Sequence, residues 1–427
     1  MSELAAPSDQ MRFRPIKLAT IDVESFPAAI EGGSRYGALR ALVREHDRPR
    51  GMIQVPFEDG CVSRERLTAA IAVLPAPSQA PVPRPSRKRI LPRISVVVPS
   101  LLEREEGLQA CLRSLADVDY PAYEVIVVDN RRAGAPPVDL PGVRVVRETR
   151  PGISAARNRG LEVATGEIVA FTDDDVEVDP GWLLAIATRL AEHPEEACVS
   201  GLALPRELET SAQVALEEYY GGFGPRTFEP VSHRMRSPGV CSSLRPATVD
   251  ALTERGRVRS FSLYATGSFG LGANMAFRSR TLRELGGFDL ALGAGTDARG
   301  GEDLLMFARL AWRGYSIGFE PAAIVHHTHR RDEASLERQI YGYGLGYAAL
   351  LTALVLEDPR HLGRMLGTAG RAVRVMSAGY RDKLDAGKQT NPRTRELARM
   401  ELRGMAAGPF VYLRSRFRIR SRLRRAR

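Results

Sequence analysis

Residues 94–175 alternate between short apolar runs and helical segments, and this alternation restricts the fold more than any other feature of the chain. The apolar runs are rich in β-branched residues, as expected of strands covered on both faces. The segment between the first two runs has leucines and a cysteine at helical spacing. An alternation of this kind predicts an α/β fold with a mostly parallel, Rossmann-like sheet flanked by helices. The runs are "ISVVVPS", "YEVIVVDN", "GVRVVRE" and "GEIVAFTDDD".

Carboxylates follow two of these predicted strands. Asp129 ends the second run, and Asp173, Asp174 and Asp175 end the fourth. Because ligands bind beyond the carboxyl ends of strands in open α/β sheets, we expect all four to line one crevice. Three adjacent carboxylates repel one another, and Mg²⁺ or Mn²⁺ would relieve that repulsion. Asp173 and Asp175 face the same way in an extended chain. A solvated acidic turn or helix cap is the alternative.

Two further residues could serve an anionic or nucleotide ligand at this edge. Asp129 could accept hydrogen bonds from a base or ribose, although a turn residue explains it equally well. Arg157, in "RPGISAARNRG", lies between the third and fourth runs, and arginine suits phosphate geometry. A solvated helix face is the alternative for the arginine.

The second half of the chain supplies a different set of candidates. Residues 269–279, "FGLGANMAFRS", are rich in small residues that would let a ligand approach the backbone closely. Glu302 and Asp303 open a predicted helix after two glycines, where they serve either the helix dipole or general-base chemistry. His327 ends a predicted strand in "IVHHTHR", and a histidine near a carboxylate cluster is a plausible metal ligand.

The order of these motifs resembles the family 2 glycosyltransferases of GT-A fold, of bacterial type, over residues 94–335. The segments that carry the resemblance are "ISVVVPS", "VIVVDN", "RPGISAARNRG", "VAFTDDDVEVDPGWL", "GANMAFR", "GGFD", "GGEDLLMFARLAWRGY" and "PAAIVHHTHR". The resemblance implies an inverting, metal-dependent enzyme that transfers a sugar from a nucleotide-diphosphate sugar to an acceptor hydroxyl. The acceptor implied is a glycan, a lipid-linked intermediate or another envelope or secondary-metabolite hydroxyl.

The resemblance also implies roles for individual residues. Asp173 and Asp175 are similar to the Asp-x-Asp motif that holds Mg²⁺ or Mn²⁺, and His327 is similar to the histidine that completes that site. Asp303 is similar to the catalytic base, with Glu302 beside it. The residues that the resemblance assigns to the nucleotide-sugar are Asp129, Arg157, Asn158, Asp173, Asp174, Gly272 and Asn274.

Two positions depart from the family pattern. The first strand runs into "SLLER", residues 100–104, in place of the usual nucleotide-contacting turn. Leu305 stands where a second acidic residue usually follows the base. The second departure keeps a catalytically silent nucleotide-sugar binding module as an alternative. A nucleotidyltransferase is a further alternative, although the chain lacks a Gly-rich, lysine-containing loop after the first strand.

Composition shifts divide the chain of 427 residues, which is too long for one ordinary core. The first unit is a small α+β unit, with "ALRALVREH" and "GMIQVPF" as predicted strands and "SRERLTAAIAVL" as a helix. Proline and basic residues then indicate a semi-extended linker. We expect a small N-terminal accessory unit (1–75), the linker (76–93), a GT-A domain (94–335), a C-terminal helical extension (336–380) and a basic tail (381–427).

The C-terminal tail carries most of the chain's positive charge. Residues 411–427 hold eight arginines and no acid, and removing eight from the net charge of +10 leaves +2. A segment that interleaves arginines with apolar residues could lie on an anionic membrane surface. A plain disordered tail is equally compatible, and nucleic acid is the least favoured partner because no recognition motif accompanies the charge.

The location of the protein is predicted from signals that the sequence lacks. The N-terminus has no apolar core of a secretory signal, and no run reaches the roughly 18 apolar residues of a membrane span. The most apolar stretch, residues 341–356, predicts a buried helix, with an interfacial helix as the alternative. Four scattered cysteines without metal-binding spacing are expected to be reduced. We therefore expect a cytoplasmic protein, either free or peripheral at the inner face of the plasma membrane.

Overall fold

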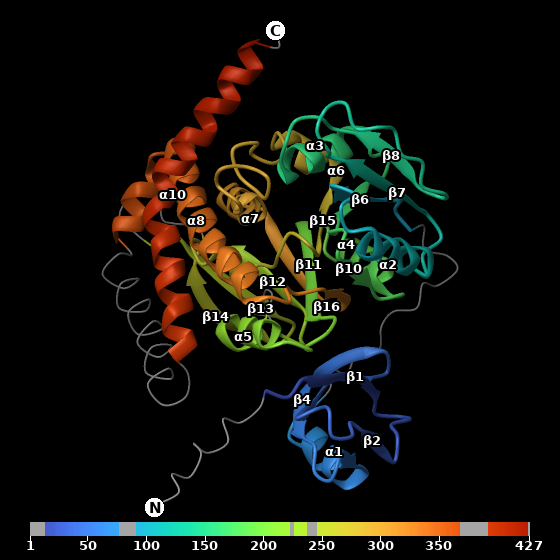
Figure 1. Ribbon diagram of the computed structural model, residues 1–427. Helices are drawn as coiled ribbons and strands as arrows, with labels where there is room; N and C mark the ends of the chain where they lie inside the picture. Colours follow the sequence, from blue (N-terminus) through green and yellow to red (C-terminus); the bar gives the residue numbers. More distant parts are fainter. Residues whose placement is uncertain (1–12, 77–90, 223–225, 237–245, 368–391, 426–427) are drawn as a thin grey trace, which may run out of the picture.

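A computed structural model describes residues 13–76, 91–222, 226–236, 246–367 and 392–425 (Figure 1). Its centre is an 11-stranded sheet in the order β14-β13-β12-β16-β11-β15-β9-β6-β7-β8, with β10 paired to β16. The strands are β6 (Ile94–Ser100), β7 (Tyr123–Asp129), β8 (Arg144–Arg147), β9 (Ile168–Phe171), β10 (Val176–Val178), β11 (Glu196–Pro205), β12 (Val231–Met235), β13 (Thr248–Thr253), β14 (Gly256–Ser262), β15 (Met275–Arg278) and β16 (Ser316–His327).

Helices cover both faces of this sheet. Those of the main body are α2 (Glu105–Ala116), α3 (Ile153–Val163), α4 (Trp182–Glu192), α5 (Ser211–Tyr220), the single-turn η1 (Thr266–Ser268), α6 (Ser279–Glu284) and α7 (Glu302–Trp312). Two long helices, α8 (Glu333–Glu357) and α10 (Pro392–Arg425), lie on one side of it.

The predicted α/β architecture is confirmed. β6 pairs in parallel with β7 and β9, β7 with β8, and β11 with β16. β15 lies antiparallel between β9 and β11, so that β8, β7, β6, β9, β11 and β16 all run in one direction. The remaining described strands of the C-terminal edge are joined by antiparallel pairs.

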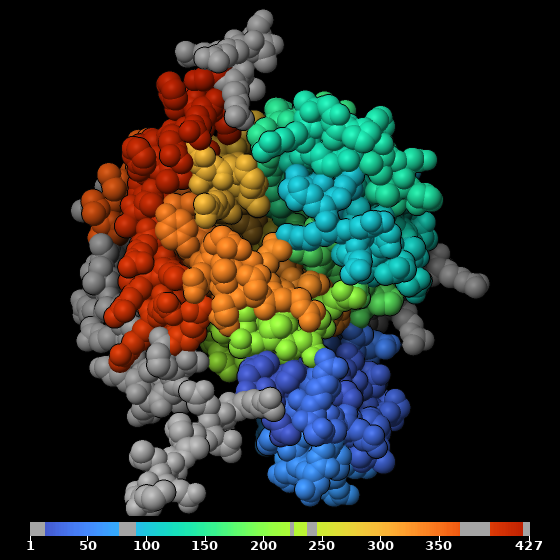
Figure 2. Space-filling model, in the orientation of Figure 1, coloured from blue at the N-terminus to red at the C-terminus, as the bar shows by residue number. Residues whose placement is uncertain are grey.

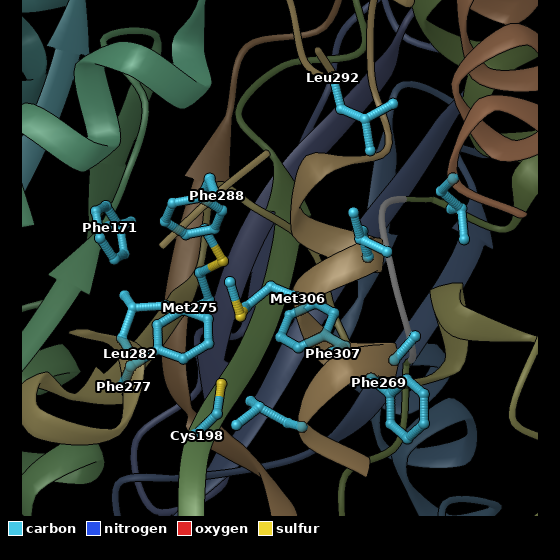
Figure 3. Close-up of a cluster of buried hydrophobic side chains, with 14 of the residues drawn as sticks. Phe171, Cys198, Phe269, Met275, Phe277, Leu282, Phe288, Leu292, Met306 and Phe307 are labelled. Atoms are coloured by element: carbon cyan, nitrogen blue, oxygen red, sulfur yellow. The ribbon is translucent and has the colours of Figure 1, made fainter. Parts of the chain in front are cut away.

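The two faces of the sheet explain why its central strands are mostly apolar. Successive residues of β6 point to opposite faces, so Val97 packs in one core and Val96 and Val98 in the other. The core on the α7 side holds a group of aromatic rings (Figure 3), in which Phe171 and Phe288 meet edge to face at 5.3 Å between centroids. Burial on both faces favours apolar residues at successive positions of the strand.

The N-terminal segment forms its own small sheet. β1 (Ile16–Asp22), β3 (Ala38–Glu45) and β4 (Arg48–Pro56) pair in that order, β2 (Ala29–Glu31) pairs with β5 (Cys61–Ser63), and α1 (Arg64–Ala72) packs against them. The two predicted strands and the helix are confirmed by β3, β4 and α1, and the Ser63 side chain caps α1. The domain boundaries stay a prediction, and most of the linker, residues 77–90, lies outside the described residues.

The N-terminal unit is docked on the main body (Figure 2). The backbone of Ile16 bonds to that of Leu208, and the Arg44 side chain forms an ion pair with Asp179. Residues 13–76 therefore adjoin the carboxyl end of β11, which lies beside the end of β16.

α8 is, within the described ranges, the one helix long and apolar enough to cross a membrane, and 56% of its most apolar window is buried inside the protein. It packs along α10 and also contacts α5 and α7. This packing agrees with the buried helix predicted for residues 341–356.

The predicted basic tail is helical over much of its length. Its residues 392–425 form α10, so a disordered tail does not describe them. Residues 381–391 and 426–427 lie outside the described part of the chain.

Candidate active site

The carboxyl ends of β6, β7 and β9 meet at one edge of the sheet. Ser100, at the end of β6, lies opposite Asp129 at the end of β7. The Ser100 hydroxyl donates a hydrogen bond of 2.6 Å to Asp174, which follows β9. Parallel pairing thus gathers Asp129 and the three consecutive aspartates at the edge where the sequence places them.

Asp173, Asp175 and His327 form a candidate metal centre. One ligand atom of each residue lies within 4.8 Å of the other two. The chain turns after Asp175 into β10, which pairs antiparallel with β16 and sets Val176 opposite His327. This pairing brings the His327 Nε2 to 3.5 Å from the Asp175 carboxylate. Two carboxylates and an imidazole are a donor set that suits a divalent cation such as Mn²⁺ or Mg²⁺.

Arg104 is a site residue that the sequence analysis missed. Its guanidinium forms an ion pair with Asp175 and lies 3.5 Å from Asp174. Burial raises the pKa of Asp174, and the neighbouring Asp175 and Asp173 raise it further, while the Ser100 hydrogen bond and Arg104 lower it. The "SLLER" loop that departs from the family pattern therefore supplies a cation to the aspartate cluster. In the sequence, Arg104 is visible only as a basic residue in a loop that has no assigned role.

Arg157 links the aspartate cluster to the start of α7. Its side chain is 1% exposed and donates hydrogen bonds to Glu302 at 2.7 Å, to Asp173 at 3.1 Å and to the Gly272 carbonyl oxygen at 3.1 Å. Burial lowers the pKa of Arg157, but the charges of Asp173, Glu302 and Asp303 outweigh it and raise the pKa. A side chain this buried acts on the carboxylates around it, and the predicted contact of Arg157 with a nucleotide stays a prediction.

Glu302 and Asp303 lie side by side in the first turn of α7. The Asp303 carboxylate accepts hydrogen bonds from the backbone N–H of Gly272 at 2.7 Å and of Leu304 at 2.8 Å. Burial raises the pKa of both carboxyls, and the charge of Arg157 opposes the rise in each. A carboxyl with a raised pKa in a fixed position is suited to take a proton near neutral pH.

Gly272 lies where the predicted base and the buried arginine meet. A Cβ at this position would be 2.8 Å from Arg157 Nη2 and 3.0 Å from the Asp303 carboxylate. The backbone of Gly272 also bonds to both residues. The small size of Gly272 therefore allows these two side chains to pack against its backbone. The sequence suggested only that small residues here would let a ligand approach.

The two predicted asparagines are used inside the protein. The Asn274 side chain is buried, accepts a hydrogen bond from the Trp182 indole and donates to two backbone carbonyls. The Asn158 amide bonds in both directions to the backbone of Phe288, in the loop before α7. Both residues hold elements around the site together, and their predicted contacts with a nucleotide-sugar stay predictions.

Leu305 points into the hydrophobic core. It is fully buried in the same core as the aromatic rings of Figure 3. An acidic side chain at this position would be buried in that apolar core. The direction of the side chain therefore explains why a leucine stands here in place of the usual acid. The loss of a second acid leaves the carboxylates of Glu302 and Asp303 and their bonds intact.

Asp129 is buried between two arginines. Its carboxylate accepts hydrogen bonds from the Arg131 backbone and side chain at 2.8–3.0 Å and pairs with Arg147. Burial opposes ionisation, but the hydrogen bonds and charges of Arg131 and Arg147 prevail and lower the pKa of Asp129. The carboxylate is therefore ionised at neutral pH, and two arginines that the sequence analysis missed lie beside it.

A protein-family model matches part of the chain. Residues 95–240 match the model described as Glycosyl transferase family 2. This part of the chain is similar to glycosyl transferase family 2. The family 2 segment contains Asp129, Arg157 and the three aspartates, and it confirms the resemblance inferred from the motifs. The match ends before Glu302, Asp303 and His327, whose place in the site rests on the structure alone.

Curated relatives match parts of the chain. The pre-mycofactocin glycosyltransferase of Mycobacterium tuberculosis is 29% identical over 69% of this chain and 54% of its own length. The succinoglycan biosynthesis protein ExoM of Rhizobium meliloti is 29% identical over 55% of this chain and 66% of its own. The uncharacterized glycosyltransferase YibD of Escherichia coli is 34% identical over 23% of this chain and 31% of its own. The chain thus spans less than two thirds of each relative.

Solved structures show a distant likeness. A mannosyltransferase from Pyrobaculum calidifontis, solved with GDP-Man and Mn²⁺, is 19% identical, covers 77% of this chain and 90% of its own, and has a TM-score of 0.45. GalNAc-T7, solved with UDP, GalNAc and Mn²⁺, is 16% identical over 63% of this chain and 51% of its own, with a TM-score of 0.40. These TM-scores are too low to establish a common fold by themselves.

Proposed function

We propose that this protein is an inverting, metal-dependent glycosyltransferase that moves a sugar from a nucleotide-diphosphate sugar to an acceptor hydroxyl. The observation that carries the proposal is the gathering of Asp173, Asp175 and His327 at the end of a strand in a family 2 segment. Arg157 connects this cluster to Glu302, beside the buried carboxyl of Asp303. The glycosyltransferase names of the curated relatives support the same class of reaction.

The proposed chemistry has two parts, one at each of the two groups of acids that Arg157 joins. Asp173, Asp175 and His327 would hold a divalent cation, which supplies charge neutralisation for a departing diphosphate. Asp303 takes the proton of the acceptor hydroxyl as the acceptor oxygen bonds to the anomeric carbon. The bond from that carbon to the diphosphate oxygen breaks in the same step, which inverts the configuration. The two backbone N–H groups that bind Asp303 hold its carboxylate in position.

The residues around Asp129 suit the nucleotide end of the donor. Asp129 remains proposed as the contact for the nucleobase, and it fixes Arg131 and Arg147 beside the crevice. Arginine geometry matches phosphate oxygens, so these two side chains extend the proposed donor site. A donor of this kind fits the cytoplasmic location proposed for the protein, and the proposed acceptor is a glycan or a lipid-linked hydroxyl.

Calorimetric titration with UDP, GDP and dTDP, in Mn²⁺ and then in EDTA, tests the donor site. We expect one nucleotide to bind in Mn²⁺ and to bind at least about tenfold more weakly in EDTA or in Asp173→Ala, a loss of about 1.4 kcal/mol. Asp250→Ala is the matched control, because Asp250, on β13, is ion-paired with Arg236 and lies several strands away from β9 in the sheet. Binding of none of the three nucleotides in either condition would refute the donor site.

Asp303→Asn separates an enzyme from a silent binding module. The amide keeps the shape of the carboxylate but cannot accept the acceptor's proton, so we expect unchanged nucleotide affinity and a turnover lower by about 10²–10⁴-fold. Product analysis by chromatography distinguishes the reactions, since a glycosyltransferase releases a nucleoside diphosphate and a nucleotidyltransferase releases pyrophosphate. Release of pyrophosphate, or wild-type turnover in Asp303→Asn, would contradict the proposed mechanism.

A further inference from the structure

α10 presents a row of large apolar side chains to solvent. Leu402, Phe410, Leu413 and Phe417 are 47%, 70%, 51% and 72% exposed. With 3.6 residues per turn, these positions and Ala406 fall on one side of the helix along about four turns. We call this row the outer stripe. A contiguous exposed row of this kind is unusual on a soluble monomer and indicates an interaction surface.

The orientation of the outer stripe is fixed by the opposite face of α10. The Tyr412 hydroxyl donates to Asp289 at 2.8 Å, and the buried Ser415 hydroxyl donates to a backbone carbonyl oxygen at 2.8 Å. Arg418 forms an ion pair with Asp297 at 2.9 Å. These bonds hold α10 to the loop that precedes α7, so the helix cannot rotate to bury its outer stripe without breaking them. Figure 1 shows α10 along the outside of the molecule, with its C-terminal end beyond the main body.

The charge on α10 selects the kind of partner. Its sequence contains eleven arginines and two glutamates, a net charge of +9. Arg399, Arg403 and Arg420 are exposed and share the outward side with the stripe. Of the two acids, Glu401 binds tyrosine hydroxyls of α5, and Glu396 forms an ion pair with an arginine of the first turn. The outer stripe is therefore bordered by cations and faces an anionic partner with an apolar layer.

We propose that the outer stripe of α10 docks the protein on the surface of an anionic lipid bilayer. The phenylalanine and leucine side chains enter the boundary between headgroups and acyl chains, and the guanidinium groups meet lipid phosphates. The helix lies along the surface and does not span it. Four apolar side chains would stay exposed to water on a nucleic acid, and a second copy would bring two faces of high positive charge together. The inference is independent of glycosyl transfer.

Vesicle flotation with the full chain tests the inference. The protein is mixed with vesicles of phosphatidylcholine alone, or of phosphatidylcholine and phosphatidylglycerol in equal parts, and centrifuged through a density gradient. We expect it to float with the anionic vesicles and to stay at the bottom with the neutral ones. Phe410→Ser combined with Phe417→Ser, and separately Arg403→Glu combined with Arg420→Glu, should each weaken partitioning by about tenfold or more.

Matched controls lie on the N-terminal unit, away from α10. Val73→Ser removes an apolar side chain that is 83% exposed, and Arg14→Glu with Arg64→Glu makes the same change of net charge. Both controls should float like the wild type. Unchanged circular dichroism of every variant shows that the fold is intact.

Three outcomes would overturn the inference. The first is no flotation of the wild type, and the second is equal flotation of the α10 variants and the controls. The third is light scattering that shows a dimer without vesicles which the phenylalanine pair converts to a monomer, because the stripe would then bind a second copy. In the first of these outcomes, retained binding to duplex DNA in the phenylalanine variant would assign the charge to nucleic acid.

Discussion

The guanidinium of Arg157 lies between two carboxylates that are far apart in the sequence, Asp173 and Glu302. Taking a cation out of water costs several kcal/mol, and good geometry with hydrogen-bonded partners is needed to offset that cost. Arg157 has such geometry, because its donors reach both carboxylates and the Gly272 carbonyl oxygen. The acids at the end of β9 and at the start of α7 thus depend on one buried side chain.

Arg157→Met should lower the free energy of unfolding by about 3–5 kcal/mol, because it leaves Glu302 buried without its cation. The same change should raise the pKa of Glu302 further, since Arg157 lowers it in the wild type. Urea denaturation followed by circular dichroism measures the stability. Arg159→Met on the same helix is the control, because Arg159 forms only a half-exposed pair with Glu162 and should cost less than about 1 kcal/mol.

A double variant decides whether the Arg157–Glu302 pair is responsible. Arg157→Met with Glu302→Gln should recover part of the loss, since the charge left unpaired by the first change is removed by the second. Additive losses in the double variant would show that the pair does not couple the two residues, and wild-type stability of Arg157→Met would show that the buried network contributes nothing.

The site residues whose positions follow from strand geometry could be predicted from the sequence, and those placed by a loop could not. Asp173, Asp175 and His327 come together because parallel strands end at one edge and alternate residues share a face. Arg104 reaches the same cluster from a loop with no regular period, so no pattern indicates it. Asn274 belongs to the segment rich in small residues that the sequence singled out, but its side chain turns to the Trp182 indole.

At the scale of elements, α10 is the main feature that the sequence did not indicate. Gly404, Gly408 and Pro409 are helix breakers by intrinsic propensity, and arginines alternate with apolar residues near the end of the chain. Packing against α8 overrides that propensity. The glycines allow the two backbones to approach, with Gly404 against Tyr341 and Gly408 against Ala348. Strands β6, β7, β8 and β9, by contrast, follow directly from their β-branched runs.

Gly404→Ala should destabilise the protein although alanine favours helices by about 1 kcal/mol. The added Cβ would overlap the backbone of Tyr341, and overpacking of this kind typically costs about 1–3 kcal/mol. Gly342→Ala in α8 is the matched control, because a Cβ there would meet its nearest atom, in Arg299, at 3.7 Å. We expect a lower melting temperature for Gly404→Ala and an equal or higher one for Gly342→Ala. A higher melting temperature for both would contradict close packing of α8 and α10.

At the scale of the molecule, charged pairs join the N-terminal unit to the main body. Arg40 forms an ion pair with Glu217 at 2.9 Å, and Glu217 also binds Arg226 and His329, at 2.6 and 2.8 Å. These contacts join segments far apart in the chain, so composition and local pattern carry no trace of them. Burial of such groups makes the stability of the whole protein depend on pH. The buried histidines give the clearest case, because each resists protonation where the unfolded chain accepts it.

His233 should make the protein less stable as the pH falls from 6.5 towards 4. It is buried on β12 between Phe261 and Phe269, and burial lowers its pKa from 6.5 to about 4. Between these values the unfolded chain binds a proton that the folded chain does not. The contribution of His233 to the free energy of unfolding, up to about 3 kcal/mol, is therefore present in full above pH 6.5 and is lost as the pH approaches 4.

His233→Phe removes this proton and keeps an aromatic ring among its neighbours, so its free energy of unfolding should change less steeply with pH in that window. Urea denaturation at a series of pH values from 7 to 4 measures how steeply the free energy of unfolding changes with pH in each protein. This range includes the lowered pKa of His233. His46→Phe is the control for replacing a histidine by phenylalanine, because the His46 side chain lies on the N-terminal unit and is 73% exposed. Parallel curves for the wild type and His233→Phe would mean that the folded protein admits the proton to this core after all, and that the ring cluster opens to solvent before the sheet unfolds.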